Sequence, residues 1–203
     1  MPRSSLKTIA PAGTDLFGRD PAWPDGLRYE AGFLSADEER SLIDAFASLP
    51  LAPFQFGAFE GKRRVASFGF RYDFSDQRLH AAEPIPEYVR PFQAKAEAFA
   101  GLTPNAVKHV LFTEYETGAG IGWHRDKAAF DVVIGLSLGS ACPLRFRRKE
   151  GDGWQRFTLD AAPRSIYLMR GEARSDWEHS IPPVEAPRYS ITLRTMASDH
   201  ALG

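Results

Sequence analysis

The chain has 203 residues, a net charge of −1 and a hydrophobic fraction of 43%, as expected of one soluble domain that buries a core without disulfides. Its one cysteine excludes an internal disulfide framework and a multi-cysteine zinc site, and its charge argues against a protein that binds polyanions over its whole surface. The apolar runs are too short to cross a membrane and the first residues lack an apolar signal segment, so we expect a cytoplasmic location.

Two helices are predicted after an irregular arm at residues 1–27, where prolines and glycines recur without a period. Ser35 and Glu38 have the spacing of a capping box, which starts the first helix, and Pro50 ends it. The second helix covers about residues 85–100 and is followed directly by a glycine. Both helices carry apolar residues at helical spacing and should therefore pack on a core.

The rest of the chain predicts strands. Residues 54–59 and 65–72 alternate and are rich in aromatics, which indicates two strands joined by a turn at 60–63. Short strand-like segments follow the second helix, separated by Gly, Pro and Asp: 109–115, 132–138, 144–148, 154–159, 165–169, 174–178 and 189–194. This pattern is typical of an antiparallel sandwich or barrel. We therefore expect an α+β fold with a double-sheet β core, in one domain over residues 28–203.

Three residues have the spacing of a metal site. His124 and Asp126 form a His-x-Asp, and at a strand end residues i and i+2 can direct their side chains to one ion. His179 follows at the end of another predicted strand. Two histidines and one carboxylate form the facial triad of non-haem Fe(II) oxygenases, which keeps positions open for a keto-acid cosubstrate and dioxygen. The alternative is a surface turn beside a hydrogen-bonded core histidine.

Two arginines on the last predicted strand form a second pattern. Arg188 and Arg194 share one face with Ser190 and Thr192, because side chains alternate along a strand. Guanidinium groups on the inward face of a β core are costly unless they meet anions, and a dicarboxylate cosubstrate would supply them. The alternative is an edge strand whose charged face is solvated.

Four ordered motifs resemble one known family. They are residues 113–118 with Tyr115 inside them, the His-x-Asp at 124–126, His179, and the Arg-x5-Arg at 188–194. In this order and spacing they are similar to the AlkB family of 2-oxoglutarate- and Fe(II)-dependent dioxygenases. The resemblance implies a double-stranded β-helix (jelly-roll) core, with helices packed on one side and a nucleotide-recognition hairpin on its N-terminal side.

The resemblance also implies a role for each motif. The ligands of Fe(II) would be His124, Asp126 and His179. Tyr115 and Arg188 would bind the distal carboxylate of 2-oxoglutarate. Arg194 would lie near the ligand Asp126 and the carboxylate closest to the metal, and O2 would be the second cosubstrate.

The chain departs from the family pattern at a few positions. Thr113 and Ser190 stand where the family has asparagines, and we expect them to keep polar contacts with the cosubstrate. Thr117 replaces a proline. Lys127 and its neighbours stand where some members carry a carboxylate that reads the damaged base, which weakens any inherited base preference.

Residues from about 54 to 76 resemble the lid that AlkB-like proteins place over a flipped base. Aromatic side chains there would stack on the base, and basic side chains would contact phosphates. The candidates are Phe70, Tyr72, Arg63, Arg64 and Arg71. Trp123 and Trp177, which flank proposed ligands, would form the wall of the pocket, and packing in the core is the alternative for both. For the lid, the alternative is an ordinary hairpin with core aromatics and a solvated basic turn.

The family chemistry implies oxidative removal of N-alkyl groups from damaged or methylated nucleic-acid bases, with release of an aldehyde, succinate and CO2. The partner would be a nucleic acid with an alkylated base, single-stranded or flipped, and we expect a monomer. Two alternatives stay open: the same chemistry on a protein side chain, a modified tRNA nucleoside or a small molecule, and a non-catalytic β-sandwich module. A second basic cluster, residues 145–149, is interpreted as a solvated outer sheet face rather than a phosphate track.

Overall fold

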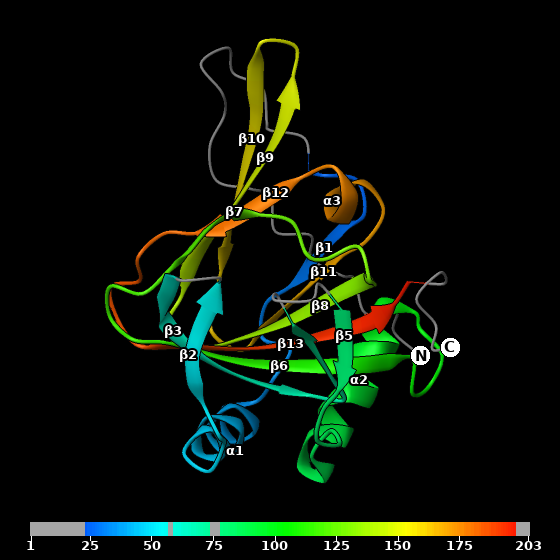
Figure 1. Cartoon of the computed structure of the whole chain (residues 1–203), viewed down its shortest axis with the longest axis vertical. Coiled ribbons are helices and arrows are strands. Elements are labelled where there is room, and N and C mark those ends of the chain that lie inside the picture. The colour runs from blue at the N-terminus through cyan, green and yellow to red at the C-terminus, as the bar shows by residue number, and fades with distance from the viewer. Residues whose placement is uncertain (1–22, 57–58, 74–77, 198–203) are drawn as a thin grey trace, which may run out of the picture.

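Two antiparallel β-sheets face each other in the structure, a computed structural model that describes residues 23–56, 59–73 and 78–197 (Figure 1). Within these residues the larger sheet has the strand order β1 (Leu27–Glu30), β11 (Ser165–Met169), β8 (Phe130–Gly139), β13 (Arg188–Met196), β6 (Val107–Tyr115), β3 (Phe59–Phe68) and β2 (Ala52–Phe56). The smaller sheet has the order β10 (Gly153–Ala161), β9 (Cys142–Glu150), β12 (Glu178–Ile181) and β7 (Ile121–His124). A separate ribbon pairs β4 (Phe70–Asp73) with β5 (Arg78–Ala81). The α+β fold with a jelly-roll core is confirmed.

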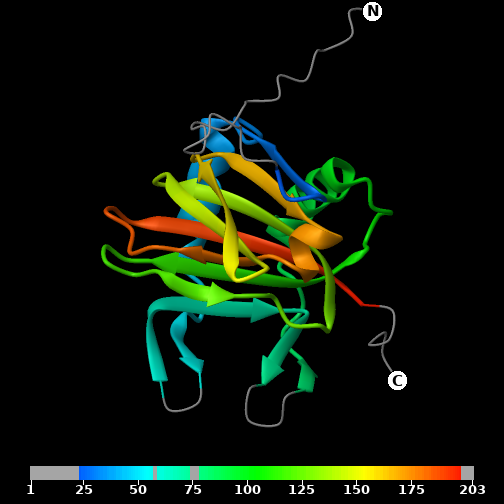
Figure 2. The same cartoon turned by 90° about the horizontal axis from the view of Figure 1, so that it is seen from above.

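Two helices cover the outer face of the larger sheet, as the views from the side and from above show (Figure 1, Figure 2). α1 (Ala36–Phe46) begins at the predicted capping box: Ser35 Oγ accepts the Glu38 N–H at 3.1 Å, and Glu38 Oε2 accepts the Ser35 N–H at 2.9 Å. α2 (Arg90–Ala100) follows the 3-10 helix η1 (Glu87–Val89) and ends at Gly101, whose φ is 69°. Helices are therefore packed on one side of the core, as predicted.

Because side chains alternate along a strand, each central strand of the larger sheet directs one set of residues toward the helices and the other set into the space between the sheets. On β13, Ile191 and Leu193 point toward the helices, whereas Ser190, Thr192 and Arg194 line the space between the sheets. The helix side gathers a continuous apolar cluster that includes Leu42, Phe46, Val110, Phe112, Ile134, Leu136, Ile166 and Leu168. Since β13 lies between β8 and β6 in the sheet interior, the solvated edge strand is excluded as an explanation of its arginines.

The lid differs from its prediction. The turn expected at 60–63 lies inside β3, and the strand expected at 65–72 is interrupted at Gly69. Gly69 has a φ of 79°, and a side chain there would meet the Lys108 carbonyl oxygen, so the chain bends at this glycine and continues as β4. The lid is therefore two hairpins, β2–β3 and β4–β5, instead of one. Residues 57–58 and 74–77 of the predicted lid lie outside the described residues.

Two other predicted elements change. The strand expected at 174–178 is the short helix α3 (Glu172–Ser175) followed by β12, because a run this short carries too little periodicity to separate helix from strand. Most of the arm at 1–27 lies outside the described residues, but its last part packs: Leu27 begins β1, and the Trp23 ring lies 5.0 Å from that of Phe157. No helix in the described part of the chain has the length and apolar character needed to cross a bilayer.

Gly135 makes room for an aromatic side chain of the inter-sheet wall. It lies on β8 directly opposite Tyr167 of β11, and a Cβ at this position would overlap the tip of the Tyr167 ring. We expect Gly135→Ala to lower the free energy of unfolding by about 1–3 kcal/mol, as overpacking does in close-packed cores. Urea unfolding measures the change. Gly153→Ala, which would make only ordinary contact at 3.7 Å, is the matched control and should lie within about 0.5 kcal/mol of wild type.

Candidate functional site

A large cavity lies between the two sheets, with the lid hairpins along one side. Its volume is about 920 Å³, which is at the upper end of ordinary ligand sites. Asp126 is the only carboxylate among the described residues that line it. Five cations line it: Arg63, Arg71, Arg125, Lys127 and Arg194. Among the described residues that line the cavity, positive charge is therefore in excess, although the whole chain has a net charge of −1.

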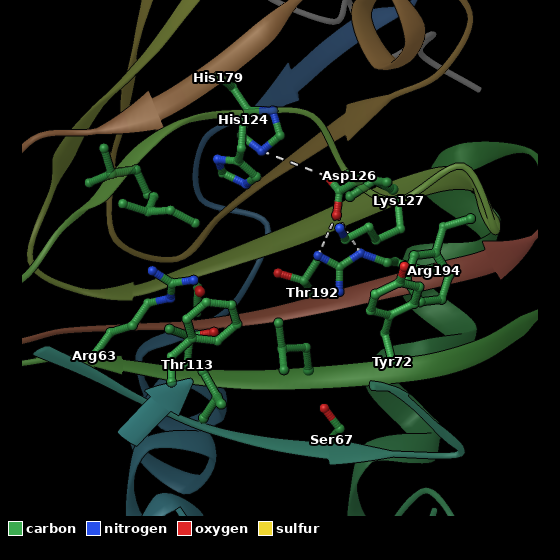
Figure 3. Close-up of a pocket in the computed structure, with 18 of the residues that line it drawn as sticks. Arg63, Ser67, Tyr72, Thr113, His124, Asp126, Lys127, His179, Thr192 and Arg194 are labelled. Carbon is green, nitrogen blue, oxygen red and sulfur yellow. Dashed lines mark hydrogen bonds and ion pairs between the residues drawn. The ribbon is translucent and has the colours of Figure 1, made fainter. Parts of the chain in front are cut away.

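Pairing of β7 with β12 brings the two predicted histidine ligands together. His124 and His179 lie opposite each other in the strand register, and their ring centroids are 4.2 Å apart. Asp126 follows β7 and turns toward the same point, with Oδ2 3.7 Å from His179 Nε2 (Figure 3). The triad predicted from spacing thus converges at one end of the cavity.

The triad has the protonation states that metal binding requires. Burial and the neighbouring His124 lower the pKa of His179 to about 3, so this imidazole is neutral near pH 7. Burial also lowers the pKa of His124. At Asp126, burial alone would raise the pKa, but Arg194 donates from Nε to Oδ1 at 2.8 Å and holds the pKa well below its ordinary value. Two neutral imidazoles therefore face one ionised carboxylate.

The unused atoms of the triad are those that a metal would need. Asp126 Oδ2 is buried without a hydrogen-bond partner. His124 Nδ1 lies 2.9 Å from Gly122 O, and in the tautomer we assign it donates there, which leaves Nε2 as the ligand atom. Among the described residues, no three His, Cys, Asp or Glu side chains are already spaced as a closed metal cage. The donor set fits Fe(II).

Arg188 is a buried cation with unused donors. It is 1% exposed and lies behind Tyr115, with its guanidinium carbon 5.0 Å from the ring centroid. Nη2 donates to Ser137 Oγ at 3.3 Å, whereas Nε and Nη1 have no hydrogen-bond partner. The Cys142 thiol does not compensate this charge, because burial raises its pKa and keeps it neutral. Two orphaned donors on one guanidinium fit a carboxylate, such as the distal one of 2-oxoglutarate.

The other predicted cosubstrate residues surround this position. Tyr115 lines the cavity in front of Arg188. Thr113 and Ser190 lie opposite each other in the pairing of β6 with β13, and both also line the cavity. Hydroxyl groups therefore stand at the two positions where the sequence departs from the family's asparagines.

His109 also belongs to the site, although it lies outside the four motifs that indicated the site in the sequence. It is buried on β6, its Nδ1 lies 3.3 Å from Arg194 Nη1, and its ring stacks against Phe130 at 4.7 Å. Burial, and then Arg194, lower its pKa well below the ordinary value, so it can accept a hydrogen bond from the guanidinium. His109 and Asp126 thus fix Arg194 from two sides.

The lid brings three of the predicted substrate residues to the cavity. Arg63 and Tyr72 line it (Figure 3), as does Arg71, and Arg63 stacks on the Phe54 ring at 3.8 Å from the centroid. The Lys127 ammonium lies 4.8 Å from the Tyr72 ring centroid, which links the lid to the loop that carries Asp126, the predicted metal ligand.

Two predicted substrate residues lie elsewhere. Arg64 points to the other face of β3 from Arg63, because neighbours alternate along a strand, and donates to Glu114 Oε2 at 2.6 Å. Phe70 follows the bend at Gly69 and is not among the cavity-lining residues. Neither side chain lines the cavity, and a contact of either with the substrate stays a prediction.

The two tryptophans beside the metal site differ. Trp123 lines the cavity, as predicted. Trp177, for which the sequence did not separate pocket wall from core, is 2% exposed and belongs to the inter-sheet apolar cluster.

Comparison with known proteins gives the family. The family model of the 2OG-Fe(II) oxygenase superfamily matches residues 26–195. The mouse alpha-ketoglutarate-dependent dioxygenase alkB homolog 7, mitochondrial, is 30% identical over 172 residues, which cover 81% of this chain and 72% of that protein. The mouse tRNA (carboxymethyluridine(34)-5-O)-methyltransferase ALKBH8 is 31% identical over 169 residues, 80% of this chain and 25% of that protein. The chain spans between a quarter and about half of the first curated relatives that it matches.

A solved structure agrees on the fold. The structure of OsALKBH1 superposes with a TM-score of 0.65 and 17% identity, covering 86% of this chain and 98% of that one. The family match over residues 26–195 includes the jelly-roll core and the four strands that carry the motifs, β6, β7, β12 and β13. The chain therefore belongs to the 2OG-Fe(II) oxygenase superfamily, and it is an AlkB-type dioxygenase that uses Fe(II), 2-oxoglutarate and O2.

Proposed function

We propose that this dioxygenase oxidises an alkyl substituent on a nucleic-acid base, with His124, Asp126 and His179 as its iron ligands. The observation that carries this proposal is the charge of the cavity, where five cations face a single carboxylate that is itself a proposed metal ligand. A polyanion with an extruded base fits such a cavity, because phosphates meet the basic side chains while the base enters between the sheets. Tyr72 supplies an aromatic face at the same place.

The chain's own residues would hold and shield the reaction. Arg188, with Tyr115, would bind the distal carboxylate of the cosubstrate, Thr113 and Ser190 would add hydroxyl contacts, and Arg194 would bind near the metal. Bound iron with 2-oxoglutarate and O2 supplies an oxidant that removes a hydrogen atom from an alkyl carbon. Apolar side chains of both sheets, such as Val133, Leu144 and Met169, would exclude water from that oxidant.

The charge of the cavity also bears on which base is accepted. A base that carries a positive charge, such as N1-methyladenine, would meet Lys127 and Arg63, whereas the one carboxylate among the described lining residues, Asp126, is already paired with Arg194. A neutral or anionic substituted base would not meet this repulsion. The proposed N-dealkylation therefore concerns neutral N-alkylated bases such as 3-methyluracil, and oxidation of a neutral or anionic substituent on uridine is the second candidate.

RNA is the favoured strand. The mouse relative matched over 80% of this chain is named as a tRNA methyltransferase that acts on carboxymethyluridine, although the chain covers only 25% of that protein. A plant relative from Arabidopsis thaliana carries the name of an alkylated DNA repair protein, so DNA is the alternative strand. We propose a single dioxygenase domain over residues 28–203 that acts in the cytoplasm as a monomer.

A substrate panel tests the proposal. The purified protein with Fe(II), 2-oxoglutarate and ascorbate is incubated with RNA and DNA oligonucleotides that carry neutral, anionic or cationic alkylated bases, and with methylated peptides. Nucleosides are then analysed by mass spectrometry. Oxidation of a base in RNA is the expected result. Oxidation of a peptide alone would contradict the proposal and favour a protein substrate.

Lys127→Glu should change the base preference. The substitution replaces a cavity cation that contacts Tyr72 by the carboxylate that some AlkB-type enzymes carry after the His-x-Asp. We expect the ratio of N1-methyladenine to 3-methyluracil turnover to rise roughly tenfold, since a nearby charge is reversed in a partly desolvated site. Competition between the two bases in one reaction measures the ratio. Lys108→Glu, at an exposed position outside the cavity, is the control and should leave it unchanged.

A further inference from the structure

The outer face of the smaller sheet carries a ladder of cations and aromatic rings. Arg145, Arg147 and Lys149 of β9 share this face, and the strand register places Thr158, Arg156 and Trp154 of β10 beside them in the same order. Glu178 of β12 lies next to Arg147. The opposite face of β9 holds Leu144 and Phe146, which are buried in the inter-sheet cluster. The basic cluster at 145–149 is therefore directed away from the core.

The ladder is ordered by stacking contacts. The Arg147 guanidinium lies between two indoles, 4.4 Å from the ring centroid of Trp123 and 4.2 Å from that of Trp154. Arg145 contacts the Trp123 ring at 5.2 Å, and Lys149 contacts the Trp154 ring at 5.5 Å. Cations and rings thus alternate in the order Arg145, Trp123, Arg147, Trp154 and Lys149.

This face exposes an aromatic ring among basic side chains. Trp154 is 39% exposed, and only Tyr88 joins it as an exposed large hydrophobic residue in the described part of the chain. Lys149 lies opposite Trp154 in the strand register and donates from Nζ to the Asp152 carbonyl oxygen at 3.1 Å. Arg156 follows Trp154 by two residues on the same face, and both cations are exposed. Two carboxylates share the face: Glu178 is paired with Arg147 at 2.6 Å, and Asp160 lies on β10 toward the end away from Trp154. Positive charge is in excess next to an accessible aromatic surface.

The ladder is continuous with the reaction cavity. Trp123 belongs both to the ladder, through its contacts with Arg145 and Arg147, and to the cavity wall. It lies on β7, the edge strand of the smaller sheet and the strand that carries His124. From there the face extends along β9 and β10, whose hairpin projects beyond the rest of the sheet in Figure 1. A strand whose base enters the cavity can therefore continue over this face.

We propose that this face binds the single-stranded backbone that flanks the reacting base, with Lys149 and Arg156 on phosphates and Trp154 stacked on an unpaired base. The inference rests on the proposed nucleic-acid function and adds the path of the strand outside the cavity. Charge complementarity selects the occupant, because basic side chains interleaved with an exposed aromatic ring are the combination that binds single strands with little sequence preference. This replaces the interpretation of residues 145–149 as a merely solvated face.

The salt dependence of binding distinguishes the proposed phosphate contacts from the proposed stacking of Trp154 on a base. Fluorescence anisotropy is measured with the full chain and a labelled single-stranded oligoribonucleotide of about 16 nucleotides. Lys149→Gln and Arg156→Gln should each reduce the slope of log affinity against log salt by about 0.7, because each releases one phosphate contact. Trp154→Ala should lower affinity roughly 5- to 100-fold without changing the slope, and Trp154→Phe should restore most of it. Thermal unfolding of each variant checks that the fold is retained.

Arg40→Gln is the matched control. Arg40 is an exposed arginine on α1, across the larger sheet from the ladder. The Arg40→Gln variant should bind the oligonucleotide with the affinity and the salt slope of wild type. The inference is overturned if wild type oxidises a base in the oligonucleotide while Lys149, Arg156 and Trp154 variants bind it as wild type does. If wild type neither binds nor oxidises any oligonucleotide, the proposed nucleic-acid function is wrong, and so is the proposed binding of a single strand to this face.

Discussion

His124→Ala is expected to abolish succinate formation from 2-oxoglutarate while the fold is retained. His124 would supply one of three protein donors to iron, through Nε2. Loss of an outer-shell partner of a metal ligand already costs about 10–100-fold in affinity or activity, so loss of a ligand should cost more than about 100-fold. The fold should survive because the ring is half-buried and its one hydrogen bond is to Gly122 O, within its own turn.

Fe(II) affinity and succinate formation are measured together, with circular dichroism as the check on folding. His80→Ala is the matched control: His80 is an exposed histidine on β5 outside the cavity, so its loss should change neither quantity. Unchanged turnover in His124→Ala would remove His124 from the metal site and with it the facial triad.

Arg188→Met is expected to separate stability from function. Arg188 is buried with Nε and Nη1 unpartnered, so a methionine of similar length removes an uncompensated charge. We expect the free energy of unfolding of the cosubstrate-free protein to stay equal or to rise by up to about 4 kcal/mol, as when buried charges are replaced by apolar groups. The KM for 2-oxoglutarate should rise roughly 30-fold or more, because a buried charge-assisted contact is lost.

Urea unfolding without cosubstrate and succinate formation across a 2-oxoglutarate series measure the two effects. Arg64→Met is the control, since it removes an arginine that is paired with Glu114 away from the cavity and should leave the KM unchanged. A destabilised Arg188→Met protein with a normal KM would mean that Arg188 is structural and that another cation, with Arg63 the first candidate, binds the distal carboxylate.

Local signals in the sequence predicted the helices and the motif residues. Ser35 and Glu38 form their capping box within one turn, and Gly101 ends α2 through its own backbone conformation, so neither depends on distant residues. The triad could also be predicted from the sequence, because His-x-Asp places two proposed ligands within three residues and His179 lies at the end of a predicted strand. Alternation along β13 placed Arg188 and Arg194 on one face, as the structure confirms.

Features that depend on strand register or on distant partners could not be predicted from the sequence. Arg63 and Arg64 are adjacent cations, and only the pairing of β3 with β6 decides that Arg63 faces the cavity while Arg64 meets Glu114. His109 acquires its role from Arg194, which lies far along the chain on the neighbouring strand. The ladder on the smaller sheet requires β10, β9, β12 and β7 to be in register before the Arg147 guanidinium lies between Trp154 and Trp123.

A crystal structure with Mn(II) in place of Fe(II) and with 2-oxoglutarate would show which residues bind the metal ion and which bind the distal carboxylate. We expect the ion to be bound by His124 Nε2, Asp126 Oδ2 and His179 Nε2. The distal carboxylate should contact Arg188 through Nε and Nη1, the two donors that lack partners. An ion held by other residues, or a distal carboxylate on Arg63 with Arg188 still unpartnered, would contradict the account.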